Sequence, residues 1–449
     1  MIMAAKKSLQ GGRPMYDVAV VKYKEGLESL KKAVNLVGGL QGFSGASKVV
    51  IKPNLVQWPE GMDFPKYGVL TTARLIEELV VLLKEHGVRQ ISLVEGPADG
   101  TFRLAASGMG LNFLAERYGV DLVDVFEGPF ARVTAGDVTL SVSKTVLDAD
   151  HVIDMPVMKT HGEAMVSLGI KNLKGVLNVA SRQRCHSAHP SSDLNYHLVK
   201  LTDMLRPSLT IIDGIYTLER GPYFMGDAHR TDIIVASRDL ISADKVGAAI
   251  LGIPPQTVPY IALAAENKGR PPDLSDINIL GDTPLAAVSR LHQWELAWSK
   301  AGDMPNQLDL FGVKGITWRK VDNTLCSHCS TFLPRYIGAG ILLAKNRDKP
   351  LDDIEILSGK TRDPEGGHKH TLLVGQCQVK RNGRNPLINH SVKIGGCPPS
   401  EEDFFKGYRE LGIDLPDNFI EQVQKIPGIF YLPKYAGKPE FQEDFFRIR

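Results

Sequence analysis

The runs that decide the fold class are KVVIKPNLV (48–56), TTARLIEELVVLLKEHG (71–87) and ISLVEGP (91–97). The first and third are short and apolar, as is typical of buried strands. Between them, apolar residues recur at helical spacing from an initial Thr to a final Gly, which predicts a helix. A strand, a helix and a strand in this order predict two parallel strands covered by the helix.

The same alternation continues over the first two-thirds of the chain. Further strands are predicted at 16–23, 121–127, 151–159, 209–216, 231–239 and 277–282, with helices at 25–37 and 241–253. Apolar strands separated by helices predict an α/β fold with a mainly parallel sheet and helices on both faces. We assign this domain to residues 15–290.

A change of composition marks the end of that domain. Residues 291–315 are irregular, with two Trp and scattered Gly, and are predicted to be a linker. An amphipathic stretch and three short strands follow, IEILSGK (354–360), TLLVGQC (371–377) and SVKIGGC (391–397). Residues 316–449 are therefore predicted to form a smaller α/β unit that carries four cysteines.

Length and composition limit the class of protein. A chain of 449 residues predicts two or three domains, and 43% hydrophobic with 23% charged residues is ordinary for a globular protein. The net charge of +2 gives no electrostatic reason to expect nucleic acid or a membrane surface as partner. No apolar run approaches the roughly 20 residues that span a bilayer, and the N-terminal residues do not read as a signal peptide. We expect a cytoplasmic protein.

Four of the five cysteines form a candidate ligand set for a metal centre. Cys326 and Cys329 make a C-x-x-C, whereas Cys377 and Cys397 each follow an apolar strand. Such strand ends meet at one edge of a parallel sheet, so the four thiolates are expected to bind one [4Fe-4S] cluster or one Zn²⁺ ion. Pro398 directly after Cys397 favours iron–sulfur, although the spacings match neither a ferredoxin run nor a zinc ribbon. Cys185 lacks sequence partners and is predicted to be a bystander.

A second candidate site lies in DMPVMKTHGEAMVSLGIKNLKGVLN (154–178). Apolar residues are threaded through it, which indicates a partly buried segment rather than a solvated basic loop. A desolvated lysine among other cations acquires a lowered pKa and can act as base or nucleophile, and a histidine can shuttle a proton near pH 7. The segment is predicted to bind a phosphate or carboxylate group through Lys159, His161, Lys171, Asn172 and Lys174.

This segment, with IIDGIY (211–216) and SADKVGAAILG (242–252), resembles the uncharacterised family called domain of unknown function 362. The resemblance covers about residues 15 to 290, and the K-T-H and S-L-x-x-K-N-x-K-G signatures carry it. It implies no particular activity, but members of the family are sometimes iron–sulfur proteins. Many of them have a compact ferredoxin run of cysteines, which this chain lacks.

Family-like positions at other strand ends suggest further site residues. Lys52 and Asn54 end one strand, Glu95 ends another and Asp213 ends a third, so their side chains are expected to converge on one crevice. His189 is predicted to contact the ligand from a loop. Lys159, His161, Lys171 and Asp213 are the candidate catalytic residues, and Lys52, Asn54, Glu95, Asn172, Lys174 and His189 are the candidate substrate-binding residues.

These patterns leave three hypotheses open. The first is an iron–sulfur oxidoreductase or electron-transfer enzyme that acts on a small anionic organic substrate and exchanges electrons with a redox partner protein. The second is a non-redox ligand-binding or isomerising protein whose four cysteines hold a structural zinc. The third is a cluster-bearing accessory protein that delivers electrons and performs no chemistry of its own.

Overall fold

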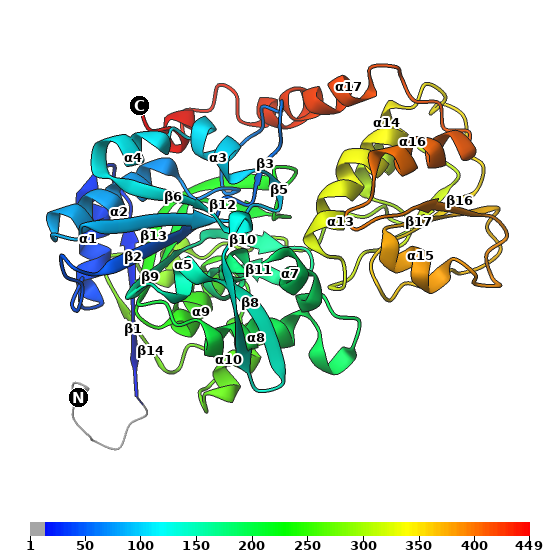
Figure 1. Ribbon diagram of the computed structural model, residues 1–449. Coiled ribbons are helices and arrows are strands. Elements are labelled where there is room, and N and C mark those ends of the chain that lie inside the picture. Colours follow the sequence, from blue (N-terminus) through cyan, green and yellow to red (C-terminus); the bar gives the residue numbers. More distant parts are fainter. Residues whose placement is uncertain (1–13) are drawn as a thin grey trace.

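The computed structural model describes residues 14–449 and contains two packed units (Figure 1). The large unit is built on one sheet in which neighbouring strands follow the order β14-β1-β13-β12-β9-β2-β4-β6. These strands are β1 (Tyr16–Lys22), β2 (Lys48–Pro53), β4 (Gln90–Glu95), β6 (Val120–Asp124), β9 (His151–Met155), β12 (Leu209–Glu219), β13 (Asp227–Ser237) and β14 (Ile277–Leu280). Strand β13 is antiparallel to β12 and β1, and the remaining pairs along this order are parallel. The predicted fold class is confirmed.

Both faces of this sheet are buried, which explains why its strands read as continuous apolar runs. In β2, Val49 and Ile51 belong to one hydrophobic core and Val50 belongs to the other. The first core is closed by α1 (Leu27–Leu36), α2 (Ala73–Glu85), α3 (Phe102–Gly108) and α4 (Asn112–Tyr118), and the second by α8 (Leu194–Met204), α9 (Leu240–Ile250) and α10 (Pro259–Asn267).

The predicted strand at 151–159 is in fact two strands. Pro156 separates β9 from β10 (Val157–His161), because proline has no N–H to donate to the ladder. Strand β10 pairs with the far part of β12 and with the short β11 (Met165–Ser167). Because of this break, Lys159 and His161 lie past the carboxyl ends of the central strands of the sheet.

Several shorter elements complete the large unit. The antiparallel pair β7 (Phe130–Ala135) and β8 (Val138–Ser143) was not predicted from the sequence. No residue of β7 is fully buried, whereas β8 alternates between buried and half-buried residues before its last two buried ones. The others are β3 (Gln57–Trp58), β5 (Asp99–Gly100), α5 (Lys144–Leu147), α6 (Gly169–Asn172), α7 (Val179–Cys185) and α11 (Leu285–Val288).

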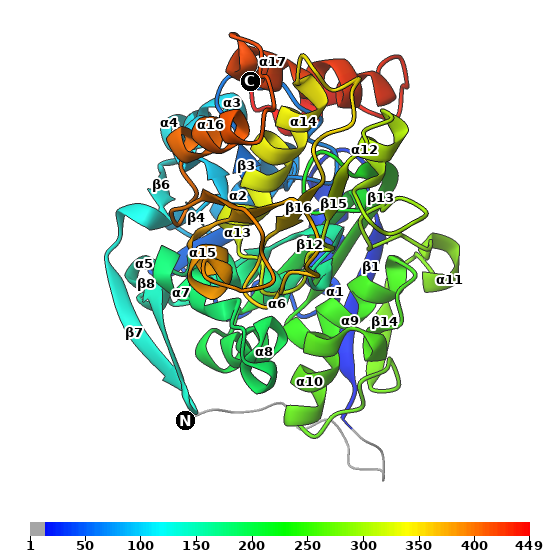
Figure 2. The same ribbon diagram turned by 90° about the vertical axis from the view of Figure 1, so that its right-hand side faces the viewer.

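The small unit is a four-stranded parallel sheet with its own core (Figure 2). Its strands, in order, are β15 (Ile316–Trp318), β16 (Ile354–Leu357), β17 (His370–Val374) and β18 (Ser391–Ile394). Its helices are α12 (Asn306–Leu310), α13 (Ser327–Phe332), α14 (Ala339–Leu343), α15 (Gln376–Asn382), α16 (Glu401–Glu410) and α17 (Phe419–Ile426).

Packing differs from the predicted domain limits at two places. Met304 and Leu308, which fall in the predicted linker, are buried in the core of the small unit. After α17 the chain returns to the large unit (Figure 1). There Tyr435, Phe445 and Phe446 join the hydrophobic core that also contains residues of α1 and α2. Across residues 14–449, no helix is both long enough and apolar enough to cross a bilayer.

Candidate functional site

Eight of the ten predicted catalytic and substrate-binding residues line one cavity of about 70 Å³. The cavity lies beyond the carboxyl ends of β2 and β4, where β10 and α6 turn over the sheet. The eight are Lys52, Asn54, Glu95, Lys159, His161, Lys171, Asn172 and Lys174. The structure therefore brings together side chains from strand ends that are far apart in the sequence.

One wall of the cavity is a closed network of buried polar groups. Lys52 Nζ and Glu95 Oε1 form an ion pair at 2.9 Å, and both side chains are almost fully buried. The Asn172 side-chain oxygen accepts a hydrogen bond from Asn54 Nδ2 at 2.9 Å, and its Nδ2 donates to Asp154 Oδ1 at 2.8 Å. Because these groups already have partners, they shape the wall rather than offer free charges.

Gly175 keeps that wall close-packed. A Cβ at this position would lie 2.7 Å from Lys52 Nζ and 2.9 Å from Glu95 Oε1. Only glycine lets the backbone pass so close to the ion pair.

Lys159 is a buried cation whose ammonium already has partners. Its ammonium donates to Asn54 Oδ1 and to the Val69 carbonyl, each at 2.7 Å. Burial, and then the charge of Lys171, lowers its pKa well below the ordinary value.

Lys171 is the cation that remains available. Among the described residues its ammonium has no hydrogen-bond or ion-pair partner, although it lines the cavity. Burial and the neighbouring Lys174 lower its pKa to about 7. It can therefore bind an anion when protonated or accept a proton when neutral.

His161 offers a hydrogen-bond donor to the same space. Its Nδ1 accepts from the Glu163 backbone N–H at 3.1 Å, so the neutral ring carries its proton on Nε2. Burial and the charge of Lys171 lower its pKa well below the ordinary value, which keeps the ring neutral.

Lys174 connects the cavity to the small unit. Its ammonium donates to His186 Nε2 at 2.7 Å and to the Ser327 hydroxyl at 3.3 Å. His186 in turn donates from Nδ1 to the Asn323 carbonyl at 2.9 Å. Ser327 lies inside the C-x-x-C, so the cysteine segment forms part of the cavity wall.

Two predicted site residues lie outside the cavity lining. Asp213 is fully buried, and its carboxylate accepts from the backbone N–H groups of Thr72 at 2.7 Å and Ile215 at 3.0 Å. It therefore anchors the start of α2, and burial raises its pKa. His189 is exposed and hydrogen-bonds to Ser191, whereas the neighbouring His186 is the buried histidine next to the site.

Three other lining residues were not predicted from the sequence: Arg182, Tyr223 and Ser327. Arg182 Nη1 donates to the Gly96 carbonyl at 2.6 Å and its Nε donates to the Leu177 carbonyl at 3.0 Å. It clamps the loops at the carboxyl end of β4. These residues lie on a helix, on a loop and in the other unit. The expectation that site residues follow the carboxyl ends of strands therefore does not identify them.

The turns that carry the four cysteines adjoin one another. Cys326 lies directly before α13, and Cys377 and Cys397 follow the adjacent strands β17 and β18. The backbone N–H of Gln376 donates to the Gly396 carbonyl at 2.9 Å, which joins the last two turns. A Cβ at Gly375 would lie 3.1 Å from Cys329 Sγ, which joins them to the first.

The four thiols also influence one another electrostatically. A hydrogen bond from Cys329 lowers the pKa of Cys326 to about 5 and raises that of Cys329, which the charges of Cys377 and Cys397 raise further. Cys397 is the exposed member of the group, and Gln183 Nε2 of the large unit donates to its sulfur at 3.1 Å.

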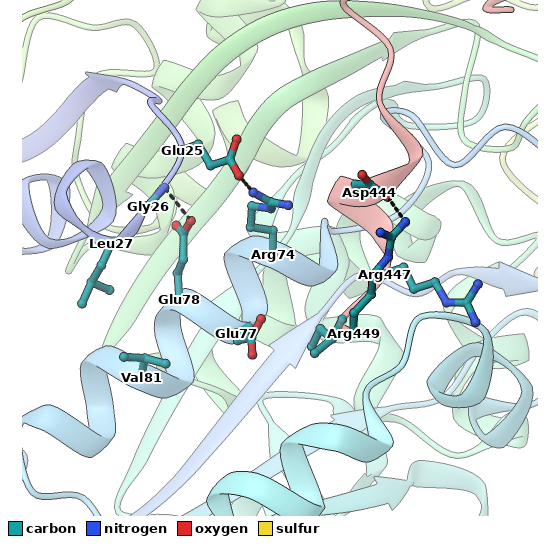
Figure 3. Close-up of a pocket in the computed structure, with 11 residues that line it drawn as sticks. Glu25, Gly26, Leu27, Arg74, Glu77, Glu78, Val81, Asp444, Arg447 and Arg449 are labelled. Atoms are coloured by element: carbon teal, nitrogen blue, oxygen red, sulfur yellow. Dashed lines mark hydrogen bonds and ion pairs between the residues drawn. The ribbon is translucent and has the colours of Figure 1, made fainter.

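A surface pocket of about 430 Å³ lies elsewhere on the large unit (Figure 3). It is bordered by charged groups that pair with one another or with neighbouring groups. Arg74 pairs with Glu25, Arg449 pairs with Asp444, and Glu78 accepts from the Gly26 N–H at 3.2 Å (Figure 3). Its chemistry gives no reason to place a reaction there.

The comparison with known families agrees with the motifs around this cavity. Residues 49–249 match the family "Domain of unknown function (DUF362)". The match contains β4, β10, α6 and all but the first residue of β2, so it covers every residue of the large unit that lines the cavity. The predicted resemblance is confirmed.

Two further proteins are similar to this chain. A thylakoid-associated protein of Synechocystis sp. is 27% identical over 273 residues, which covers 60% of this chain and 83% of the relative. The lactate racemase apoprotein of Thermoanaerobacterium thermosaccharolyticum aligns with 94% of this chain and 92% of its own, at 10% identity and a TM-score of 0.38.

Proposed function

We propose that this protein is an iron–sulfur protein in which Cys326, Cys329, Cys377 and Cys397 hold one [4Fe-4S] cluster. The neighbouring cation-lined cavity binds a small anionic organic substrate, and the protein acts as an oxidoreductase or electron-transfer enzyme. The observation that carries the proposal is the contact between Lys174 and Ser327, which brings the C-x-x-C to the wall of the cavity.

The spacing of the thiols supports a cluster over a zinc ion. Four thiolates around zinc lie about 3.8 Å apart, because Zn–S bonds are about 2.3 Å and tetrahedral. Among residues 14–449, the one set of three or more His, Cys, Asp or Glu donors within 4.8 Å of one another is Glu355, Glu365 and His368, which excludes the cysteines. A [4Fe-4S] cluster carries one thiolate on each of its four irons, so its ligands do not need to lie that close together.

When bound, such a cluster accepts or donates single electrons, and ligation by four thiolates leaves no iron open to substrate. Burial and the charges of Cys326 and Cys377 raise the pKa of Cys397, and the positive charges of Lys360 and Lys380 oppose that rise. Substrate binding then falls to the cavity, where the Lys171 ammonium and the His161 Nε2–H can both donate to a carboxylate or phosphate oxygen. The volume of about 70 Å³ limits the bound part to a few heavy atoms.

Anaerobic purification and metal analysis test the proposal. We expect about four iron and four sulfide ions per chain, with a broad visible absorption that bleaches on reduction. Cys→Ser substitution at any of the four ligand positions is expected to lower the iron content severalfold. The matched control is Cys185→Ala, because Cys185 is buried in the core of the large unit. A colourless protein with one zinc per chain would support the structural-zinc hypothesis instead.

A further inference from the structure

A second cavity, of about 240 Å³, lies between the two units and is lined mainly by apolar side chains. The large unit contributes Tyr223 and Phe224, and the small unit contributes Trp318 and Leu333. The site described above makes no use of this larger space.

The larger cavity adjoins the cation-lined one along five segments of the chain. Pro222 and Tyr223 line both cavities, and the Ser330 hydroxyl of the small unit donates to the Tyr223 hydroxyl at 3.3 Å. In each of four other segments, a residue of the smaller cavity lies one to three positions before a residue of the larger one: Val56 and Gln57, Ala98 and Asp99, His161 and Gly162, Ser327 and Ser330. The larger cavity therefore begins where the smaller one ends.

The charged side chains at the larger cavity leave its space without a free cation. Asp99 pairs with Arg335 at 3.3 Å, and Arg220 pairs with Asp227 at 3.5 Å. Within residues 14–449, these two arginines are the only cations of its lining. The space between the units thus suits an uncharged, apolar group.

The remaining charged group of that lining, Glu163, interacts with the lysines of the smaller cavity. Burial raises its pKa to about 7, and the charges of Lys171 and Lys174 oppose that rise. Free positive charge is therefore confined to the compartment of about 70 Å³, and the adjoining compartment of about 240 Å³ is apolar.

We propose that the two cavities together bind one amphipathic organic acid. Its anionic head group lies in the smaller cavity, where the Lys171 ammonium and the His161 Nε2–H donate to it, and its apolar chain lies in the larger cavity. The proposal rests on the anion site proposed above and narrows its substrate to acids with an apolar chain of several carbons. It does not depend on the cluster.

Isothermal titration calorimetry with butanoate, hexanoate and octanoate tests the proposal. At pH 6.0 these acids are ionised and Lys171, with a pKa of about 7, is protonated. Each methylene buried in the larger cavity is expected to increase the affinity about fourfold. Lys171→Met is expected to weaken octanoate binding by about 10- to 100-fold, because the head group loses a charge-assisted hydrogen bond.

Gly338→Leu is designed to fill the larger cavity, because Gly338 lines it and a Cβ there would meet no atom closer than 3.7 Å. It is expected to weaken octanoate binding at least tenfold and to leave the affinity for oxalate unchanged. Gly428→Leu is the matched control. Both glycines lie in short π-helical segments, Leu333–Gly338 and Pro427–Tyr431, but Gly428 is outside the lining and has no atom within 4 Å of its Cβ position.

Thermal unfolding is measured for each variant, and the chain-length series on the unmodified protein keeps the test valid if Gly338→Leu fails to fold. Octanoate binding that is no tighter than butanoate binding, or that folded Gly338→Leu leaves unchanged, would overturn the chain site, while oxalate binding would leave the anion site standing. Octanoate binding that Lys171→Met does not weaken would also overturn the proposal, because the acid would then lie in the larger cavity alone. Failure of oxalate to bind would overturn the anion site and this proposal together.

Discussion

At the residue scale, the two central lysines of the cavity have different roles because their surroundings differ. Lys159 donates to two oxygens at 2.7 Å and is fixed in the wall, whereas Lys171 has no partner among the described residues. Sequence alone cannot separate them, because both follow apolar residues in one short segment. Burial and hydrogen-bond partners determine which of the two ammonium groups is available to a ligand.

Lys171→Met is expected to weaken the binding of oxalate, a small carboxylate probe, by about 10- to 100-fold, since one charge-assisted hydrogen bond is lost. The measurement is isothermal titration calorimetry at pH 6.5. Lys144→Met is the control, because Lys144 is an exposed lysine paired with Asp148 on the surface. Equal affinities of the two variants would remove Lys171 from the binding site.

The same lysine sets the expected pH dependence. Binding needs the protonated ammonium, and the pKa of Lys171 is lowered to about 7. Oxalate affinity is therefore full below pH 7 and falls about tenfold for each unit above it. In Lys171→Met this slope should vanish, and a slope that persists would assign the titration to another group.

At the element scale, much of the site follows from strand ends, which the sequence predicts well. Lys52, Glu95 and Lys159 stand at or beyond the carboxyl ends of apolar strands, and a parallel sheet collects such ends at one edge. Asp213 also stands within a strand, but the bend of the chain after Leu70 places the start of α2 against it. Packing decides which of the side chains at the strand ends faces the cavity. The alternation of apolar and polar residues along a strand does not reveal it.

In the small unit, too, the sequence predicts the strand ends but not how they pack against other segments. The sequence predicts that Cys377 and Cys397 follow strands, and they do. It does not reveal that the turn at Gly375 lies against Cys329, because that contact joins residues 46 positions apart (329 to 375). The close approach requires a glycine with a positive φ of 85°.

Gly375→Ala is expected to lower the iron content of the purified protein at least twofold, because its Cβ would press on Cys329 Sγ. Gly367→Ala is a matched control, since Gly367 has the same φ of 85° and open space at its Cβ position. Both substitutions should destabilise the fold by about 1–3 kcal/mol through backbone strain. Iron and sulfide are measured per chain, and equal loss in the two variants would show that strain alone is responsible.

At the scale of the whole molecule, the two units are joined by more than one covalent connection. Besides the segment between β14 and α12, the chain after α17 runs back to the large unit (Figure 1). Polar contacts between the units add to this, including the Lys360 ammonium donating to the Gln183 carbonyl at 2.9 Å and the Asn323 side chain donating to Asp193 at 2.8 Å. The position of the C-x-x-C segment relative to the cavity is thus held by contacts from both units.

Composition placed residues 435–448 in the small unit, because they follow its last helices without a break. Their aromatic residues instead fill the core beneath α1 and α2, where Phe446 meets Tyr67 and Tyr216 with ring centroids 5.5 and 5.7 Å apart. A short aromatic segment fits any apolar core, so only the folded chain reveals which one it enters.

Phe446→Ala is expected to lower the unfolding free energy of the large unit by about 3–5 kcal/mol, since Phe446 is 1% exposed and its removal leaves a cavity. Hydrogen exchange localises the effect: protection should fall in β12 and β13 and stay unchanged in β16 and β17. Phe430→Ala, at a position that is 48% exposed, should change stability by less than about 1 kcal/mol. Loss of protection in β16 and β17 alone would mean that the C-terminal segment stabilises the small unit, and that the division predicted from composition holds in solution.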